Sequence, residues 1–258
     1  MPILTSNEAE QLAKRILAMA TAPEAEVGVS GGLTGYLRFA ANTVTTSGET
    51  DDISIRFTAY QGQRHASASA NQLDDASLER VVEQAERLAK LAPEDPEYLP
   101  PLGPQQYTPV RGFVASTAHL AAKARAEAAG KAIREATSRK LVGAGFYRNR
   151  GGFSALANSK GLFAYHTSSA ATFTTTFRTP DGRGSGYAAG DSFDAAQLDT
   201  AAIAARAAAK AEASQDAREL PPGAYPVVLE PQAMSDLFSF FGFAANARAA
   251  DEGRSVFS

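Results

Sequence analysis

Side chains that bind metals or act as nucleophiles are scarce in this chain. The 258 residues include three His and no Cys, which excludes disulfides, a thiolate nucleophile and Cys-rich zinc or iron–sulfur sites. His65, His119 and His166 are far apart in sequence, and none belongs to an H-E-x-x-H motif. A zinc site needs three or four N, S or O donors, which the fold would have to gather. We therefore expect three surface or hydrogen-bonding His.

Two short patterns resemble the signatures of active sites. Residues 28–32, Gly-Val-Ser-Gly-Gly, fit G-x-S-x-G, but a nucleophile elbow lies between a strand and a helix. Here strand-like residues 34–39 follow, so we predict a hairpin turn. The glycine-rich stretch 182–190 lacks the Gly-Lys-Ser/Thr of a phosphate-binding loop. It is predicted to be a mobile loop between strands that could cover a site.

The elements that must position these residues begin with a helix. Thr5 and Glu8 are spaced as a capping box, and apolar residues then recur at helical spacing over 7–20. Apolar and polar residues alternate strictly over Asp52–Tyr60, which indicates a half-buried strand. Further strands are predicted near 25–29, 34–39 and 64–70, and a helix over 75–91. Residues 1–95 therefore form an N-terminal α+β domain.

A proline-rich segment follows. Six of the 13 prolines lie between Pro93 and Pro109, and proline fixes φ and removes a backbone donor. We therefore place an extended linker over 96–112 and a second α+β domain over 113–258. Its predicted helices are 117–139, 198–214 and one starting at Pro231; its predicted strands are 141–148, 153–158, 162–167, 171–178 and 225–230, with a turn at 158–161.

The predicted fold class is α+β, with two domains that each pack helices on a largely antiparallel sheet. Residues 256–258 resemble the start of another element, so we expect the second domain to be incomplete and to continue beyond Ser258. The formal net charge of −3 gives no reason to expect a nucleic-acid or membrane partner. No apolar run is long enough to span a bilayer and no signal peptide is recognisable, so we expect a cytoplasmic protein.

Four segments together resemble the TldD/PmbA family, also called modulator of DNA gyrase. Residues 38–48 (RFAANTVTTSG) resemble its strand and turn, and residues 158–162 (NSKGL) resemble its NS-x-G turn. Residues 220–231 (LPPGAYPVVLEP) are similar to its PPG-x-Y segment, and residues 253–257 (GRSVF) are similar to its G-x-S tail. The matches are in order and extend over nearly the whole chain.

The resemblance implies a cytoplasmic, dimeric, two-domain protein involved in peptide proteolysis. TldD-type members carry an H-E-x-x-x-H zinc motif on the helix before the G-x-S, whereas PmbA-type (TldE) members lack it and pair with a TldD-type subunit. Counting back from Ser255, the motif positions are Phe238, Ser239 and Phe243. Phenylalanine cannot ligate zinc and serine cannot replace the carboxylate base. The resemblance therefore implies a PmbA/TldE-like chain with no catalytic or metal-ligating residue of its own.

Three functions remain open at this point. The first is a non-catalytic subunit of a TldD/TldE-type metalloprotease, with zinc only in the TldD-like partner and an unfolded or leader peptide as substrate. The second is a stand-alone peptide-binding or scaffolding homodimer, and the third is an enzyme with unrecognised chemistry. Whether the chain is an enzyme is thus undecided, and its peptide-binding residues are unknown. A peptide could add to an exposed sheet edge.

Overall fold

The computed structural model describes residues 3–258. They form two compact units, the first ending at Asp216 and the second comprising Ala217–Ser258. Each unit is described by itself.

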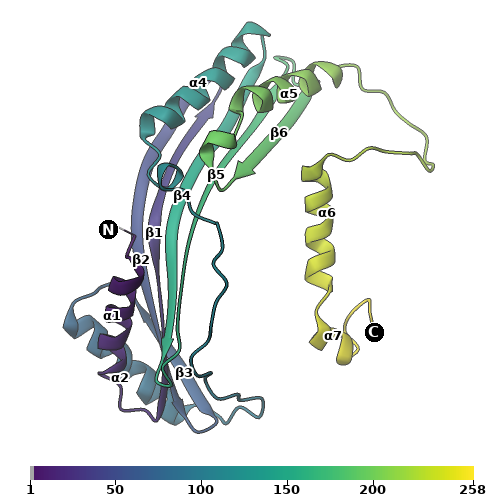
Figure 1. Ribbon diagram of the computed structural model, residues 1–258. Helices are drawn as coiled ribbons and strands as arrows, with labels where there is room; N and C mark the ends of the chain where they lie inside the picture. Colours follow the sequence, from purple (N-terminus) through teal and green to yellow (C-terminus); the bar gives the residue numbers. More distant parts are fainter. Residues whose placement is uncertain (1–2) are drawn as a thin grey trace. The chain divides into compact units, whose positions relative to one another are not determined.

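The first unit is built on one six-stranded sheet (Figure 1), in which every strand is antiparallel to its neighbours. The α+β class with an antiparallel sheet is confirmed. The sheet is continuous between the two predicted domains, because β1 pairs with β4 from Glu26↔Asn158 to Phe39↔Gly145. In spatial order the strands are β3 (Arg64–Ala70), β2 (Thr43–Gln61), β1 (Glu24–Ala40), β4 (Val142–Asn158), β5 (Phe163–Arg178) and β6 (Ser185–Ser192).

The strands are longer than predicted. The hairpin turn predicted at 28–32 is wrong, because these residues lie in the middle of β1. Their glycines instead allow neighbouring strands to approach closely. A Cβ on Gly32 would lie 2.3 Å from the carbonyl oxygen of Gly151 on β4. The breaks predicted at 149–152 and 168–170 are also absent, since β4 and β5 each run through them.

The β1–β2 hairpin turns instead at Ala41 and Asn42, whose φ angles are +48° and +58°. Two positive φ angles suit the right-handed twist of a tight hairpin, and Asn tolerates this conformation. The Asn42 side chain also accepts from the Gly143 amide at 2.7 Å and donates to the Leu141 carbonyl at 2.8 Å. The hairpin is thereby fixed to the start of β4.

All the long helices of this unit cover the same face of the sheet. The predicted alternation over 52–60 is confirmed, because Ile53, Ile55, Phe57 and Ala59 are buried. They pack under α1 (Ser6–Leu17) and α2 (Asp75–Leu91) at one end of the sheet. At the other end, α4 (Ala122–Ser138) and α5 (Thr200–Ala213) cover a second cluster around Phe39. In β1 both clusters use odd-numbered residues, so the even-numbered residues form a helix-free face.

The helix predicted over 117–139 is interrupted. Short α3 (Ala115–Ala118) ends at His119, and Ala121 is extended before α4 begins. The break leaves the Leu120 carbonyl outside a helix, where it accepts from Arg125 Nη1 at 2.7 Å. The 3-10 helix η1 (Ala195–Gln197) precedes α5.

The second unit contains α6 (Pro231–Ala244) and α7 (Ala247–Asp251). Pro231 occupies the first turn of α6 as predicted. The strand predicted over 225–230 is wrong, because this segment is irregular and pairs with no strand among the described residues. Residues 256–258 belong to no regular element. Among residues 3–258, none of the helices has the length and apolar content needed to cross a bilayer.

Candidate functional site

The connection between α2 and α3 includes an extended segment, residues 98–114, which is called the strap (Figure 1). At its start the Tyr98 hydroxyl donates to the Glu24 carboxylate on β1. Further along, Asn158 Nδ2 donates to the Leu102 carbonyl at 2.8 Å. At its end the Ser169 amide donates to the Gly112 carbonyl at 2.8 Å. Four of the six prolines that predicted an extended linker thus lie in a segment held to the sheet at both ends.

Between its attached ends, the strap covers a cleft on the helix-free face. The cleft has a volume of about 690 Å³, with Tyr107, Thr108 and Val110 of the strap on one side. Its other side is sheet, including Ser30 of β1 and His166 of β5. Strand register explains the arrangement, because Ser54, Ser30, Ser154 and His166 are consecutive partners across β2, β1, β4 and β5.

This row is suited to binding rather than to nucleophilic chemistry. A serine nucleophile requires a base within hydrogen-bond reach, and no hydrogen bond joins His166 to Ser30, Ser54 or Ser154 in the described chain. Small hydroxyl side chains leave the strands accessible and offer both donors and acceptors. The row therefore places hydroxyl groups on the floor of the cleft, among apolar residues such as Leu156 and Ala164.

At the start of the strap, charged side chains and a tyrosine hydroxyl form a cluster of polar contacts. Lys160 Nζ lies 2.6 Å from Glu24 Oε1. Hydrogen bonds from Lys160 and then from Tyr98 lower the pKa of Glu24. The bond to Glu24 in turn raises the pKa of Tyr98 to about 12. Burial raises the pKa of the neighbouring Glu26 carboxyl. The cluster therefore holds Glu24 as a carboxylate and Tyr98 as a phenol at neutral pH.

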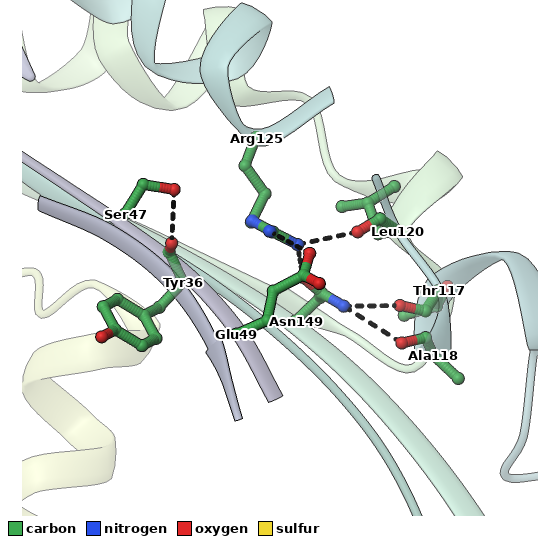
Figure 2. A network of polar contacts seen from close by, with 8 residues as sticks. All are labelled: Tyr36, Ser47, Glu49, Thr117, Ala118, Leu120, Arg125 and Asn149. Atoms are coloured by element: carbon green, nitrogen blue, oxygen red, sulfur yellow. Dashed lines mark hydrogen bonds and ion pairs between the residues drawn. The ribbon is translucent and has the colours of Figure 1, made fainter. Parts of the chain in front are cut away.

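On the opposite face, a buried arginine joins helices to strands (Figure 2). The Arg125 side chain is 1% exposed and donates to Asn149 Oδ1 at 2.8 Å and to Glu49 Oε1 at 2.6 Å. Asn149 Nδ2 donates in turn to the carbonyls of Thr117 and Ala118 of α3. The group lines a hollow of about 450 Å³. These contacts explain the cluster as a structural connection between α3, α4 and the sheet.

The structure does not bring the three His together. His65 lies on β3, His119 between α3 and α4, and His166 within β5, and all three are exposed, as predicted for surface His. Within residues 3–258, no group of three or more His, Asp or Glu side chains is placed to hold a metal.

The other residues predicted from patterns lie outside the cleft. The exceptions are Gly28, Val29 and Ser30 of the G-x-S-x-G pattern, which line the cleft. The loop predicted over 182–190 is confirmed only for 182–184, because residues 185–190 belong to strand β6; in the loop, Thr179 Oγ1 accepts from the Gly184 amide at 2.8 Å. None of the residues from 181 to 186 lines the cleft.

The positions where the family motif would place zinc ligands lie on α6. Phe238 is 61% exposed and Phe243 is 91% exposed, and neither side chain has a lone pair to donate. Between them, the Ser239 hydroxyl donates to the Asp236 carbonyl at 2.7 Å. The residues present at these positions therefore do not fit a zinc ion.

Comparison with known families gives two matches. The profile of PmbA/TldA metallopeptidase domain 1 matches residues 25–89, and that of the PmbA/TldA metallopeptidase central domain matches residues 115–215. No curated protein matches the chain in sequence.

Solved structures with the same fold include three large matches. A protein named as a modulator of DNA gyrase, from Thermotoga maritima, has a TM-score of 0.84 at 18% identity, covering 94% of this chain and 57% of its own. A second protein so named, from Bacteroides thetaiotaomicron, has a TM-score of 0.79 at 17% identity, covering 94% and 58%. TldE from Thermococcus kodakarensis has a TM-score of 0.71 at 17% identity, covering 81% and 47%. The chain thus spans about half the length of these proteins.

Proposed function

Because the chain belongs to the PmbA/TldD metallopeptidase family, we propose that it is a PmbA/TldE-like, non-catalytic subunit of a TldD/TldE-type metalloprotease that binds peptide substrates. The observation that carries the proposal is the pair Phe238 and Phe243, which leaves the motif positions without zinc ligands. Zinc and the activated water belong to a TldD-like partner, and no chemical step passes through metal in this chain.

The contribution of this chain is to hold an unfolded or leader peptide in extended form. The cleft under the strap supports this role, because its floor of serines admits a polypeptide backbone beside Ser30. Binding through backbone and hydroxyl groups needs no particular substrate side chain, which suits a subunit that receives varied peptides.

An open sheet edge lies beside the cleft and adds to this support. On its outer side β5 pairs with β6 only from Ala171 to Arg178, so no strand of the described chain pairs with residues 163–170 there. Within this stretch, the Ser169 amide already donates a hydrogen bond to the Gly112 carbonyl of the strap. An extended peptide can pair with the remaining backbone groups as an added strand.

The decisive experiment reconstitutes the chain with a TldD-like subunit that has an intact H-E-x-x-x-H motif. We expect the two to co-purify and to cleave an unfolded peptide, whereas the chelator-treated isolated chain binds the peptide without cleaving it. Ser30→Trp should fill the cleft and weaken peptide binding by about tenfold or more. Ser138→Trp, at the exposed end of α4, is the matched control and should bind as the wild type does.

Two results would redirect the proposal. A clean homodimer that binds peptide and ignores the TldD-like subunit would favour a stand-alone peptide-binding or scaffolding protein. Cleavage by the chelator-treated isolated chain would identify an enzyme with its own chemistry.

A further inference from the structure

The helix-free face carries a band of exposed arginines on neighbouring strands. Arg148 and Arg150 of β4 lie opposite Tyr36 and Thr34 of β1, in the same even-numbered set as Ser30. Arg56 of β2 lies opposite Gly28 of β1, two positions along from Ser30. The exposed members of the arginine band are Arg38, Arg56, Arg148, Arg150 and Arg178.

These arginines form no ion pair with a carboxylate of the described residues, unlike arginines on the helix-covered side. Arg15 and Arg139, for example, form ion pairs with Asp75 and Glu212. Over residues 3–258, no carboxylate lies within ion-pair distance of any member of the arginine band. The face therefore has positive side chains that no acid within the described chain neutralises.

The acidic residues of this region do not cancel the band. Asp52 lines the same hollow as Arg148 and Arg150, and its Oδ1 accepts from the Ile53 amide at 2.8 Å. Asp191, near the end of β6, is on the same face and lies opposite Thr172 of β5. The same face also carries Glu24 and Glu26 at the start of β1, where Glu24 is bonded to Lys160 and Tyr98. Around Arg148 and Arg150, arginines therefore outnumber carboxylates, although the whole chain has a net charge of −3.

The arginine band continues the peptide cleft. A hollow of about 280 Å³, lined by Arg148 and Arg150, shares Ser30 and Ser54 with the cleft under the strap. Beside it, the rings of Tyr36 and Phe146 stack with centroids 6.2 Å apart. A polypeptide that passes over Ser30 would next meet guanidinium groups and an aromatic pair.

We infer that this face selects acidic segments of polypeptide, with Asp or Glu side chains of the bound peptide on Arg148 and Arg150. The inference rests on the proposed function and specifies its substrate class. A guanidinium binds a carboxylate through two parallel hydrogen bonds, and spaced carboxylates on an extended chain suit arginines on alternate residues of one strand. The hollow shares Ser30 and Ser54 with the cleft proposed to hold peptide, which favours a polypeptide over a nucleic acid.

The test uses the full chain and fluorescently labelled, unfolded peptides of equal length that are acidic, neutral or basic. A single-stranded oligonucleotide serves as a polyanion without peptide groups. Fluorescence anisotropy should show the acidic peptide binding about tenfold more tightly than the neutral one at low ionic strength. The difference should shrink as salt is added, because exposed charges are screened.

Charge reversal tests whether Arg148 and Arg150 cause the preference for the acidic peptide. Arg148→Glu with Arg150→Glu should abolish the preference for the acidic peptide and retain binding of the neutral one. Lys131→Glu with Arg134→Glu changes the net charge equally on the exposed side of α4 and should keep the preference. If the reversed variant does not fold, Arg148→Gln with Arg150→Gln should reduce the preference in the same direction.

The outcomes separate this inference from the proposed function. Equal affinity for acidic and neutral peptides would overturn the inference and leave the proposed function standing. Failure to bind any peptide would overturn both. Tighter binding of the oligonucleotide than of the acidic peptide would show that the face recognises polyanions in general, and would also overturn the inference.

Discussion

Arg125 Nη1 on α4 lies 2.8 Å from Asn149 Oδ1 on β4, and both side chains are buried. This bond lies between the two apolar clusters of the first unit, where α3 ends and α4 begins. Each hydrogen bond to a buried guanidinium matters for stability, because a donor left unpaired costs free energy. The Leu120 carbonyl and Glu49 supply two more acceptors, whereas Nε of Arg125 is buried without a hydrogen-bond partner among the described residues. The helix break at 119–121 thus leaves a free carbonyl, that of Leu120, within reach of the buried arginine.

Replacement of Arg125 by Met should lower the free energy of unfolding by about 2–4 kcal/mol, because Asn149 and the Leu120 carbonyl lose a buried donor. Glu49→Gln should cost no more than about 1 kcal/mol, since the Glu49 side chain is 65% exposed. Urea unfolding of both variants measures the difference. Equal losses in the two variants would contradict this description of the cluster.

Gly35→Ala should be destabilising because the new Cβ would lie 2.1 Å from Arg125 Nη1 and 2.7 Å from Asn149 Oδ1. We expect a loss of about 1–3 kcal/mol from overpacking. In an Arg125→Ala background the further loss should be smaller, which a double-mutant cycle measures. Gly103→Ala, with nothing within 4 Å of its Cβ, is the control and should change stability by less than about 0.5 kcal/mol. Additive effects at positions 35 and 125 would show that the predicted contact is not the cause.

The attachment of the strap through Tyr98 and Glu24 should depend on pH. The pKa of Glu24 is lowered from 4.5, so its contribution is present above pH 4.5 and is lost as the pH falls further. The pKa of Tyr98 is raised from 10.0 to about 12, so its contribution is present below pH 10.0 and is lost as the pH rises toward 12. The strap should therefore be best protected between these limits.

Hydrogen exchange of residues 98–114, corrected for the intrinsic pH dependence of exchange, measures this protection. Tyr98→Phe keeps the aromatic ring beside Tyr60 and removes the hydroxyl. The variant should show weaker protection near neutral pH and no further loss in alkali. If wild type and variant exchange alike at every pH, the hydroxyl contact does not hold the strap.

The isolated chain should purify with far less than one zinc per molecule, because Phe238 and Phe243 offer no ligand where the family motif would place histidines. Metal analysis after dialysis against micromolar zinc tests this. The TldD-like subunit, prepared in parallel, is the positive control. About one zinc per chain, retained at stoichiometry, would overturn the assignment to the PmbA/TldE-like type.

Local sequence signals predicted several elements well. The helix α2 was predictable over 75–91 because Asp74 is a good N-cap and an apolar stripe follows it. The strand over Asp52–Tyr60 was predictable from its alternation. The G-x-S-x-G segment was not, because glycine favours a turn in isolation. Its role in β1 depends on Gly151 of β4, which is far away in the chain.

The candidate site likewise combines features that the sequence predicts with features that depend on distant residues. The sequence by itself determined an α+β chain with apolar stripes, a proline-rich extended connector, no cysteine and no histidine at the zinc-motif positions of its family. Only the tertiary structure decided that Ser30 and His166 share a row, that the connector lies over that row as a strap, and that Arg148 and Arg150 continue it. Periodicity within a segment fixes which side chains share a face, whereas strand register across β1, β4 and β5 fixes which distant residues become neighbours.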